Sequence, residues 1–180
     1  MHSYRTRIIP IIPHILETGD GIMKQRTWKT YAIWIALTEA VGILSGILSR
    51  SGSKTFSETV QQPPLSPPEF LFPIVWTILY ALMGVSAARI STAPDSVDRQ
   101  RGLNLFVIQL IINFFWSLIF FNAQAYGFAF LWLLLLWVLV LWMIISFNRV
   151  DSVAALLQLP YLLWLTFAAY LSYGVWKLNP

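Results

Sequence analysis

The chain has 180 residues, of which 57% are hydrophobic, 16% aromatic and only 11% charged, and its formal net charge is +4. Soluble domains carry about 25% charged residues, so this composition predicts a membrane protein and argues against a soluble enzyme, a disordered chain and a nucleic-acid binder. There is no cysteine, and the only histidines, His2 and His14, precede every apolar stretch. We therefore expect neither a metal site nor a resident cofactor such as haem.

Residues 1–27 are predicted to form a basic tail ahead of a membrane domain that covers residues 28–180. The beginning of this tail contains Pro10 and Pro13 and lacks the continuous apolar core of a signal peptide. The segment that begins at Met23 with Lys-Gln-Arg is a more ordinary start for a protein. We therefore expect translation to start at Met23.

Five apolar stretches are each long enough to cross the hydrocarbon core of a bilayer, which takes about 20 residues as a helix. In chain order they are residues 31–48, 70–88, 103–121, 128–147 and 153–176. Because backbone groups in lipid must bond to one another, each stretch is predicted to be a helix. The expected fold class is all-α, a five-transmembrane-helix bundle. No internal repeat is visible, so the duplicated plan of many transporters has no support here.

The linkers between these spans indicate how the bundle is oriented. The first linker, residues 49–69, ends in a segment with four prolines and is expected to be extended and stiff. Lys and Arg favour the cytoplasmic side of a membrane protein. The side of the N-terminus holds Arg5, Arg7, Lys24, Arg26, Lys29, Arg89, Arg99, Arg101 and Arg149, and the other side holds Arg50, Lys54 and Lys177. This asymmetry predicts a cytoplasmic N-terminus and an external proline-rich linker.

The second span carries an aromatic face, because Trp76, Tyr80 and Met83 are spaced i, i+4 and i+7. Such a stripe serves either as packing against another helix or as one wall of a ligand pocket. Trp76 lies near the start of the span, so an aromatic anchor at the membrane interface is a third interpretation.

The third span carries a mixed face made of Gln109, Asn113, Trp116 and Phe120. Amide side chains seldom face lipid, because an unpaired amide is costly there. They are expected to turn inward, either to bond to another helix or to contact a ligand.

The fifth span places Tyr161, Trp164, Ala168 and Leu171 on one side. Three spans thus each present a tryptophan beside a tyrosine, an asparagine or a small residue. If these faces converge, they form a flat-walled aromatic pocket that suits a large planar apolar ligand.

Two features of the first span have alternative interpretations. Glu39 lies in the middle of the span, and an acid there marks either a functional site or a neutral side chain that bonds to a neighbouring helix. Gly42 and Gly46 form a G-x-x-x-G motif, which joins either two helices of one chain or two protomers of a homodimer.

Four motifs, one on the first linker and three on different spans, occur together in this chain: Pro-Pro-Leu-Ser-Pro-Pro at 63–68, Phe-Pro-x-Val-Trp-Thr-x-Leu-Tyr-x-Leu-Met-Gly at 72–84, Asn-x-x-Trp-Ser-x-x-Phe-Phe at 113–121 and Pro-Tyr-Leu-x-Trp-x-x-Phe-Ala-x-Tyr-Leu at 160–171. In this order and spacing they closely resemble the TspO/MBR family over residues 31–179. The resemblance implies five helices around a pocket beneath the first linker, which acts as a lid. It also implies porphyrin binding, and in animal relatives the binding of cholesterol and drug-like ligands.

The resemblance implies that Trp76, Asn113, Trp116 and Trp164 line the pocket with Tyr80 and Ala168 beside them, and Phe128 matches a position that the family often fills with tryptophan. Together with the helical faces, this gives the expected ligand-binding residues: Trp76, Tyr80, Asn113, Trp116, Phe120, Phe128, Tyr161, Trp164 and Ala168.

Three functions follow from this pocket. The first is an integral protein of a bacterial cell membrane that binds porphyrins or related planar ligands in a regulatory or tetrapyrrole-handling role. The second is a transporter of tetrapyrroles or other apolar molecules. The third is a light-dependent porphyrin-degrading enzyme, in which Trp76 and Trp164 would be the candidate reacting residues. The sequence contains no catalytic triad or phosphate loop, so an enzyme is the least favoured. The expected partners are the lipid bilayer and the polycyclic ligand, and not a nucleic acid.

Overall fold

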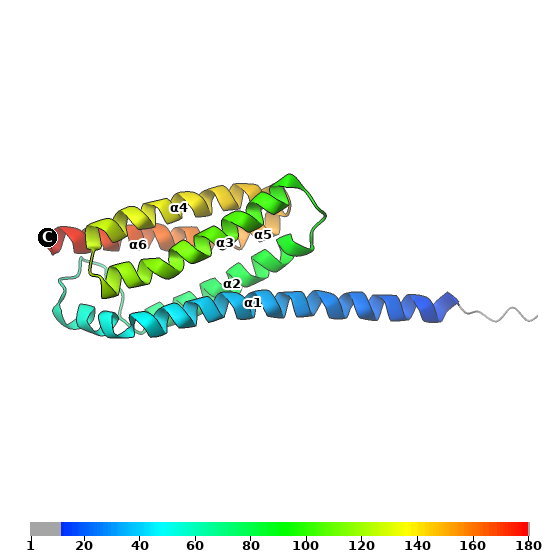
Figure 1. Ribbon diagram of the computed structural model, residues 1–180, viewed down its shortest axis with the longest axis horizontal. Helices are drawn as coiled ribbons and strands as arrows, with labels where there is room; N and C mark the ends of the chain where they lie inside the picture. Colours follow the sequence, from blue (N-terminus) through cyan, green and yellow to red (C-terminus); the bar gives the residue numbers. More distant parts are fainter. Residues whose placement is uncertain (1–11, 180) are drawn as a thin grey trace, which may run out of the picture.

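The computed structural model describes residues 12–179, with side chains from Trp28 onward, and this part of the chain is helical without strands (Figure 1). Its elements are α1 (Ile12–Thr59), α2 (Leu71–Thr92), α3 (Val97–Ser117), the π-helical turn η1 (Leu118–Asn122), α4 (Tyr126–Asn148), α5 (Ser152–Leu156) and α6 (Leu159–Leu178). The all-α class is therefore confirmed. The expected tail and the start at Met23 fall on residues 1–27, which lie outside the described side chains.

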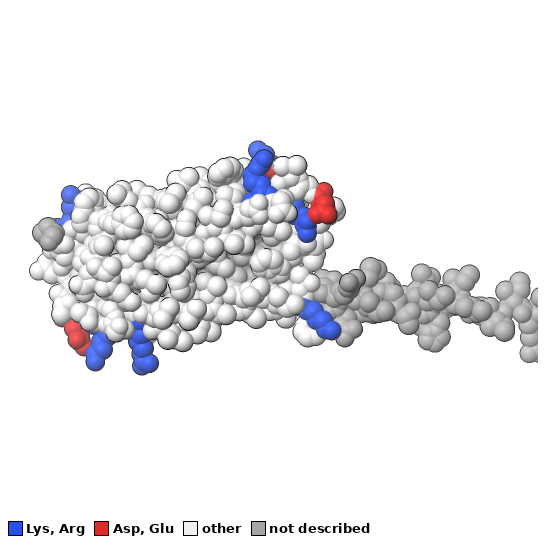
Figure 2. All heavy atoms as spheres, viewed as in Figure 1, with Lys and Arg blue, Asp and Glu red and all other residues white. Residues whose placement is uncertain are grey.

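Five segments of the described chain are long and apolar enough to cross a membrane, as predicted. They are Trp28–Thr59, Leu71–Thr92, Val97–Asn122, Tyr126–Asn148 and Ser152–Leu178. The third segment joins α3 to η1, and the fifth joins α5 to α6. On the face that Figure 2 shows, the charged side chains gather at the two ends of the bundle, with an uncharged band between them. This distribution matches a protein whose middle lies in lipid.

The first linker is shorter than predicted, because α1 continues to Thr59 instead of ending near residue 48. Residues 49–59 contain no proline, and Lys54 and Glu58 form an i, i+4 ion pair on this extension. The hydroxyl groups of Ser49, Thr55 and Thr59 each donate to the carbonyl oxygen four residues earlier. The run of prolines that begins at Pro63 then prevents further helix.

The helices α1 and α2 pack very closely, and two glycines make this approach possible. A Cβ at Gly84 would lie 2.6 Å from the Cα of Ile35, and a Cβ at Gly42 would lie 2.3 Å from the ring of Tyr80. At the same level the Thr38 hydroxyl donates to the Tyr80 carbonyl oxygen at 2.8 Å. On the opposite side of the bundle α4 packs against α3 and α6. The pair α1–α2 and the group α3, α4 and α6 are thus two sets of closely packed helices.

The end of the bundle opposite the first linker is held by a partly buried ion pair. Arg89 at the end of α2 contacts Asp151 at 2.8 Å, and Asp151 caps α5 by accepting from the Val153 and Ala154 amides. Burial raises the pKa of the Asp151 carboxyl, but the amide of Ala154 and the guanidinium of Arg89 outweigh it, so the pKa lies below its usual range. This contact ties α2 to α5.

Candidate ligand-binding site

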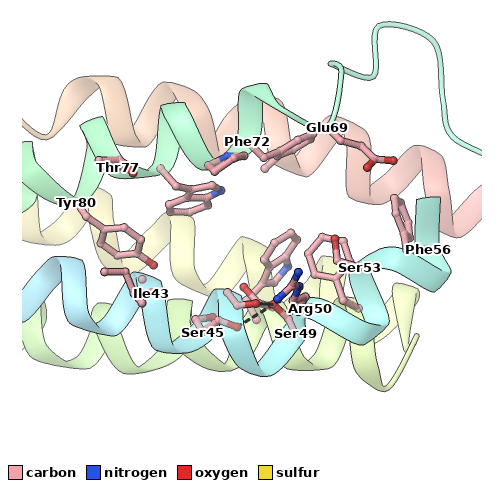
Figure 3. Close-up of a pocket in the computed structure, with 18 of the residues that line it drawn as sticks. Ile43, Ser45, Ser49, Arg50, Ser53, Phe56, Glu69, Phe72, Thr77 and Tyr80 are labelled. Atoms are coloured by element: carbon pink, nitrogen blue, oxygen red, sulfur yellow. Dashed lines mark hydrogen bonds between the residues drawn. The ribbon is translucent and has the colours of Figure 1, made fainter. Parts of the chain in front are cut away.

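A cavity of about 460 Å³ lies between α1, α2, α3 and α6, beneath the first linker (Figure 3). Its volume falls in the range of small-molecule sites, about 300–1,000 Å³. Figure 3 shows Phe72 and Thr77 of α2 on one side of this space and Ile43 and Ser45 of α1 on the other. The linker contributes Gln62 and Pro67 at the mouth, together with Glu69 just before α2.

One wall of the cavity is aromatic and is built by three helices. It consists of Phe72 and Trp76 from α2, Trp116 from α3 and Trp164 from α6, with Phe121 of η1 beside them. Phe72 and Trp164 meet edge to face with their ring centroids 6.0 Å apart. The Trp116 indole donates to the Ala129 carbonyl oxygen at 3.1 Å, which fixes its ring against α4. Rings held in this way form a preorganised surface for a planar apolar ligand.

The structure brings five of the nine expected residues to this cavity: Trp76, Tyr80, Trp116, Trp164 and Ala168. They come from the three helical faces that the sequence analysis singled out. The convergence of these faces in one cavity is therefore observed, and their contact with a ligand stays a prediction.

Asn113 and Tyr161 lie behind the cavity wall, where both are buried. The Asn113 amide donates to the Tyr80 hydroxyl at 2.9 Å, and the Tyr161 hydroxyl donates to the Gln109 amide oxygen at 3.0 Å. These bonds join α3 to α2 and α6. Of the two interpretations of the amides, a bond to another helix or contact with a ligand, the structure shows the first. Asn113 thereby fixes the position of Tyr80 in the wall.

Phe120 and Phe128 are placed outside the cavity for different reasons. Phe120 is buried and stacks against Trp116 with ring centroids 5.0 Å apart, so it supports the wall from behind. Phe128 on α4 is 54% exposed, packs on Trp132 and borders a separate shallow hollow beside Trp176. No residue of α4 lines the main cavity, because this helix packs against the far sides of α3 and α6.

The opposite wall is a polar face of α1 that the sequence analysis missed. Ser45, Ser49, Ser53 and Ser57 recur every fourth residue and all line the cavity, as does Arg50. The i, i+4 spacing of the serines was the available signal. This spacing was not recognised because residues 49–59 were predicted to form a linker and not a helix.

The structure also shows what surrounds Glu39 and the two glycines of the G-x-x-x-G motif on α1. Glu39 lines the cavity and forms no hydrogen bond or ion pair within the described residues, so the interhelical bond that was one of its two interpretations is not observed there. Gly42 packs against Tyr80, whereas Gly46 faces open cavity space, with nothing within 4 Å of a Cβ placed on it. The G-x-x-x-G motif therefore joins α1 to α2 at one glycine only.

The linker over the cavity is fastened to the end of α6. The Gln61 amide donates to Asn179 Oδ1 at 3.1 Å, and Asn179 Nδ2 donates back to the Gln61 carbonyl oxygen at 2.9 Å. The Tyr170 hydroxyl donates to the Pro64 carbonyl oxygen at 3.0 Å, and Pro63 packs where a side chain at Gly174 would otherwise lie. We call this set of contacts the α6 latch.

Replacing Asn179 with alanine is expected to loosen the α6 latch. The Gln61 amide would lose its acceptor, so its hydrogen exchange should become faster by about tenfold, as expected for one lost hydrogen bond. Hydrogen–deuterium exchange of the linker peptide measures this. Asn104→Ala is the control, because Asn104 accepts a comparable exposed bond from Gln100 at the other end of the bundle. Unchanged exchange at Gln61 in Asn179→Ala would show that the latch does not order the linker.

These features define a class: a multi-pass membrane protein of five helices with a ligand-sized aromatic cavity beneath its first linker. Within residues 28–179 no group of three or more acidic or histidine side chains is arranged to hold a metal ion. The sequence profile of the TspO/MBR family matches residues 34–177, and the chain belongs to this family.

Named relatives extend over most of the chain. It is 36% identical over 152 residues to the tryptophan-rich protein TspO of Chlorobaculum tepidum, which covers 84% of this chain and 96% of the relative. It is 33% identical over 151 residues to protein CrtK of Rhodobacter capsulatus, covering 83% and 92%. It is 34% identical over 123 residues to the translocator protein of Ovis aries, covering 67% and 73%.

Proposed function

We propose that this protein binds porphyrins or related planar apolar ligands in the cavity, in a regulatory or tetrapyrrole-handling role. The observation that carries the proposal is the meeting of Trp76, Trp116 and Trp164 from three helices around one space of about 460 Å³. Stacking on indoles and apolar burial are the interactions by which a protein holds a flat polycycle. The resemblance of the four motifs to a porphyrin-binding family points to the same ligand class.

Transport of such ligands is the second candidate, and one observation favours it. The cavity extends along α1 from Glu39 to Ser57, a rise of about 27 Å at 1.5 Å per residue. A ligand site of this length covers much of one bilayer crossing. The names of several relatives, such as the translocator protein of Ovis aries, are consistent with it.

We further propose that the N-terminus is cytoplasmic and that the cavity opens toward the outside of a bacterial cell membrane. Among the described residues, Lys29, Arg89, Arg99, Arg101 and Arg149 lie at the end away from the first linker. Arg50, Lys54 and Lys177 lie at the linker end. The larger number of cations marks the cytoplasmic side.

Titration of the purified protein with protoporphyrin IX tests the proposal directly. Trp76→Phe and Trp164→Phe are each expected to weaken binding about three- to tenfold, because each removes part of a stacking surface. The porphyrin's own absorbance should report binding, since the substitutions also change the intrinsic protein fluorescence. Trp142→Phe is the matched control, because Trp142 on α4 is 51% exposed and outside the cavity.

The same samples separate the three functions. Equal affinity in all three variants and the parent protein would refute the cavity as the porphyrin site. Illumination of the complex tests the enzyme, because a porphyrin spectrum that does not change rejects photochemical degradation. Flux of the porphyrin across proteoliposomes, lost in Trp76→Phe, would support transport.

A further inference from the structure

The two walls of the cavity differ in chemistry, and this difference constrains the ligand. The wall formed by α2, α3 and α6 is aromatic, whereas the α1 wall carries hydroxyl groups and one cation, Arg50 (Figure 3). Ser45, Ser49 and Ser57 already donate to backbone carbonyl oxygens, so a purely apolar ligand would leave Ser53 and Arg50 of this wall without partners. A ligand with a flat apolar body and a polar edge would match both walls.

Arg50 differs from the cations that follow it in the chain, because it has no partner within the described residues. Each of the others forms an ion pair or lies over an aromatic ring: Lys54, Arg89, Arg99, Arg101, Arg149 and Lys177. Arg50 lines the cavity and forms neither a salt bridge nor a side-chain hydrogen bond there. A guanidinium offers five N–H donors in a planar fork that fits a carboxylate.

Arg50 also lies at a suitable depth for the charged edge of a ligand. The neighbouring Gly52 lies against Asn122 and Phe121, and the Asn122 amide donates to the Leu48 carbonyl oxygen at 2.9 Å. Asn122 is the last residue of the third membrane span. Arg50 is therefore placed where that span ends, between the deep part of the cavity and its mouth beneath the linker.

The other charged groups of the cavity favour one direction of binding. Glu39 borders the deep end beside Tyr80, where no described cation lines the cavity to neutralise a carboxylate. The Ser53 hydroxyl, one turn from Arg50, forms no hydrogen bond within the described residues and remains free to donate. Glu69 lines the mouth but is not paired with Arg50. An anionic edge is thus accommodated near Arg50 and not near Glu39.

We infer that the cavity selects planar ligands that carry a carboxylate, and that Arg50 binds this carboxylate at the outer part of the site. The inference rests on the proposed function, that the cavity binds a flat polycycle, and adds the charge and the orientation of that ligand. The apolar body lies against the tryptophans, and the carboxylate edge faces α1.

The test compares protoporphyrin IX, which has two carboxylates, with its uncharged dimethyl ester, both titrated into the full-length protein in a neutral detergent. Arg50→Gln is expected to weaken binding of the diacid about tenfold and that of the ester less than twofold, because one charge-assisted contact is lost only with the diacid. Arg50→Lys keeps the charge and should retain most of the diacid affinity. Lys54→Gln is the matched control, because Lys54 lies one turn further along α1 outside the cavity.

Each outcome decides a separate question. If Arg50→Gln weakens the diacid and the ester equally, or neither, the inference is overturned while the proposed function stands. If neither porphyrin binds to the parent protein, the proposed function fails and this inference fails with it. If Arg50→Gln leaves diacid binding unchanged but releases added phosphatidylglycerol, Arg50 serves a lipid phosphate instead of the ligand. Thermal unfolding of each variant, expected to match the parent protein, confirms that the exposed substitutions do not act through the fold.

Discussion

Replacing Gly46 with leucine is expected to lower porphyrin affinity by about a hundredfold or more while the bundle stays folded. A Cβ at this position meets no atom within 4 Å, and Gly46 is one of the residues that line the cavity. A leucine there would project into the space between the two walls and compete with the ligand. Overpacking of a well-fitted site costs up to about 3 kcal/mol, which corresponds to this loss of affinity.

The control for this experiment is Ser51→Leu, which adds the same side chain to an exposed position of α1 outside the cavity. Its affinity for protoporphyrin IX should equal that of the parent protein, as measured by absorbance titration. Full binding by Gly46→Leu would place the porphyrin site elsewhere in the molecule.

The same change from glycine to alanine is expected to have opposite effects on stability at two positions. At Gly84 the new Cβ would lie 2.6 Å from Cα and 2.8 Å from the nitrogen of Ile35, and these backbone atoms cannot move aside alone. The helices α1 and α2 would have to separate, which lengthens the bond between Thr38 and Tyr80. We expect Gly84→Ala to lower the free energy of unfolding by about 1–3 kcal/mol, the usual cost of overpacking.

At Gly46 the added methyl group meets only open space, so the higher helix propensity of alanine should dominate. Gly46→Ala is therefore expected to raise the free energy of unfolding, by up to about 1 kcal/mol. Unfolding of both variants with increasing mole fractions of dodecyl sulfate, followed by circular dichroism, measures the difference. A Gly84→Ala protein as stable as the parent would contradict the close approach of α1 and α2.

The sequence was sufficient for the five membrane spans, because length and hydropathy are decisive in lipid. The helical spacing also predicted the faces on which Trp76, Trp116 and Trp164 line the cavity, because residues three or four apart share a helix face. Hydropathy did not predict that α1 continues to Thr59, because residues 49–59 are polar and resemble a loop in composition. The serine wall and Arg50 were missed for that reason.

Other differences between the predicted and the observed site depend on how the helices pack against one another. The periodicity of the sequence does not determine this packing. Asn113 was expected to contact a ligand, and its bond to Tyr80 depends on the distance between α2 and α3. Phe128 was expected in the pocket, but the rotation of α4 turns this side chain away from it. A helical wheel predicts which residues share a face and cannot tell which neighbouring helix that face meets.

The α6 latch has a practical consequence for how the protein is handled. Asn179 directly follows α6, and it holds the linker that lies over the cavity. Removing residues 178–180, or attaching a rigid fusion partner after them, would therefore change how the linker covers the candidate site. Affinity measurements on such material would report the altered linker, so an affinity tag is better placed at the N-terminus.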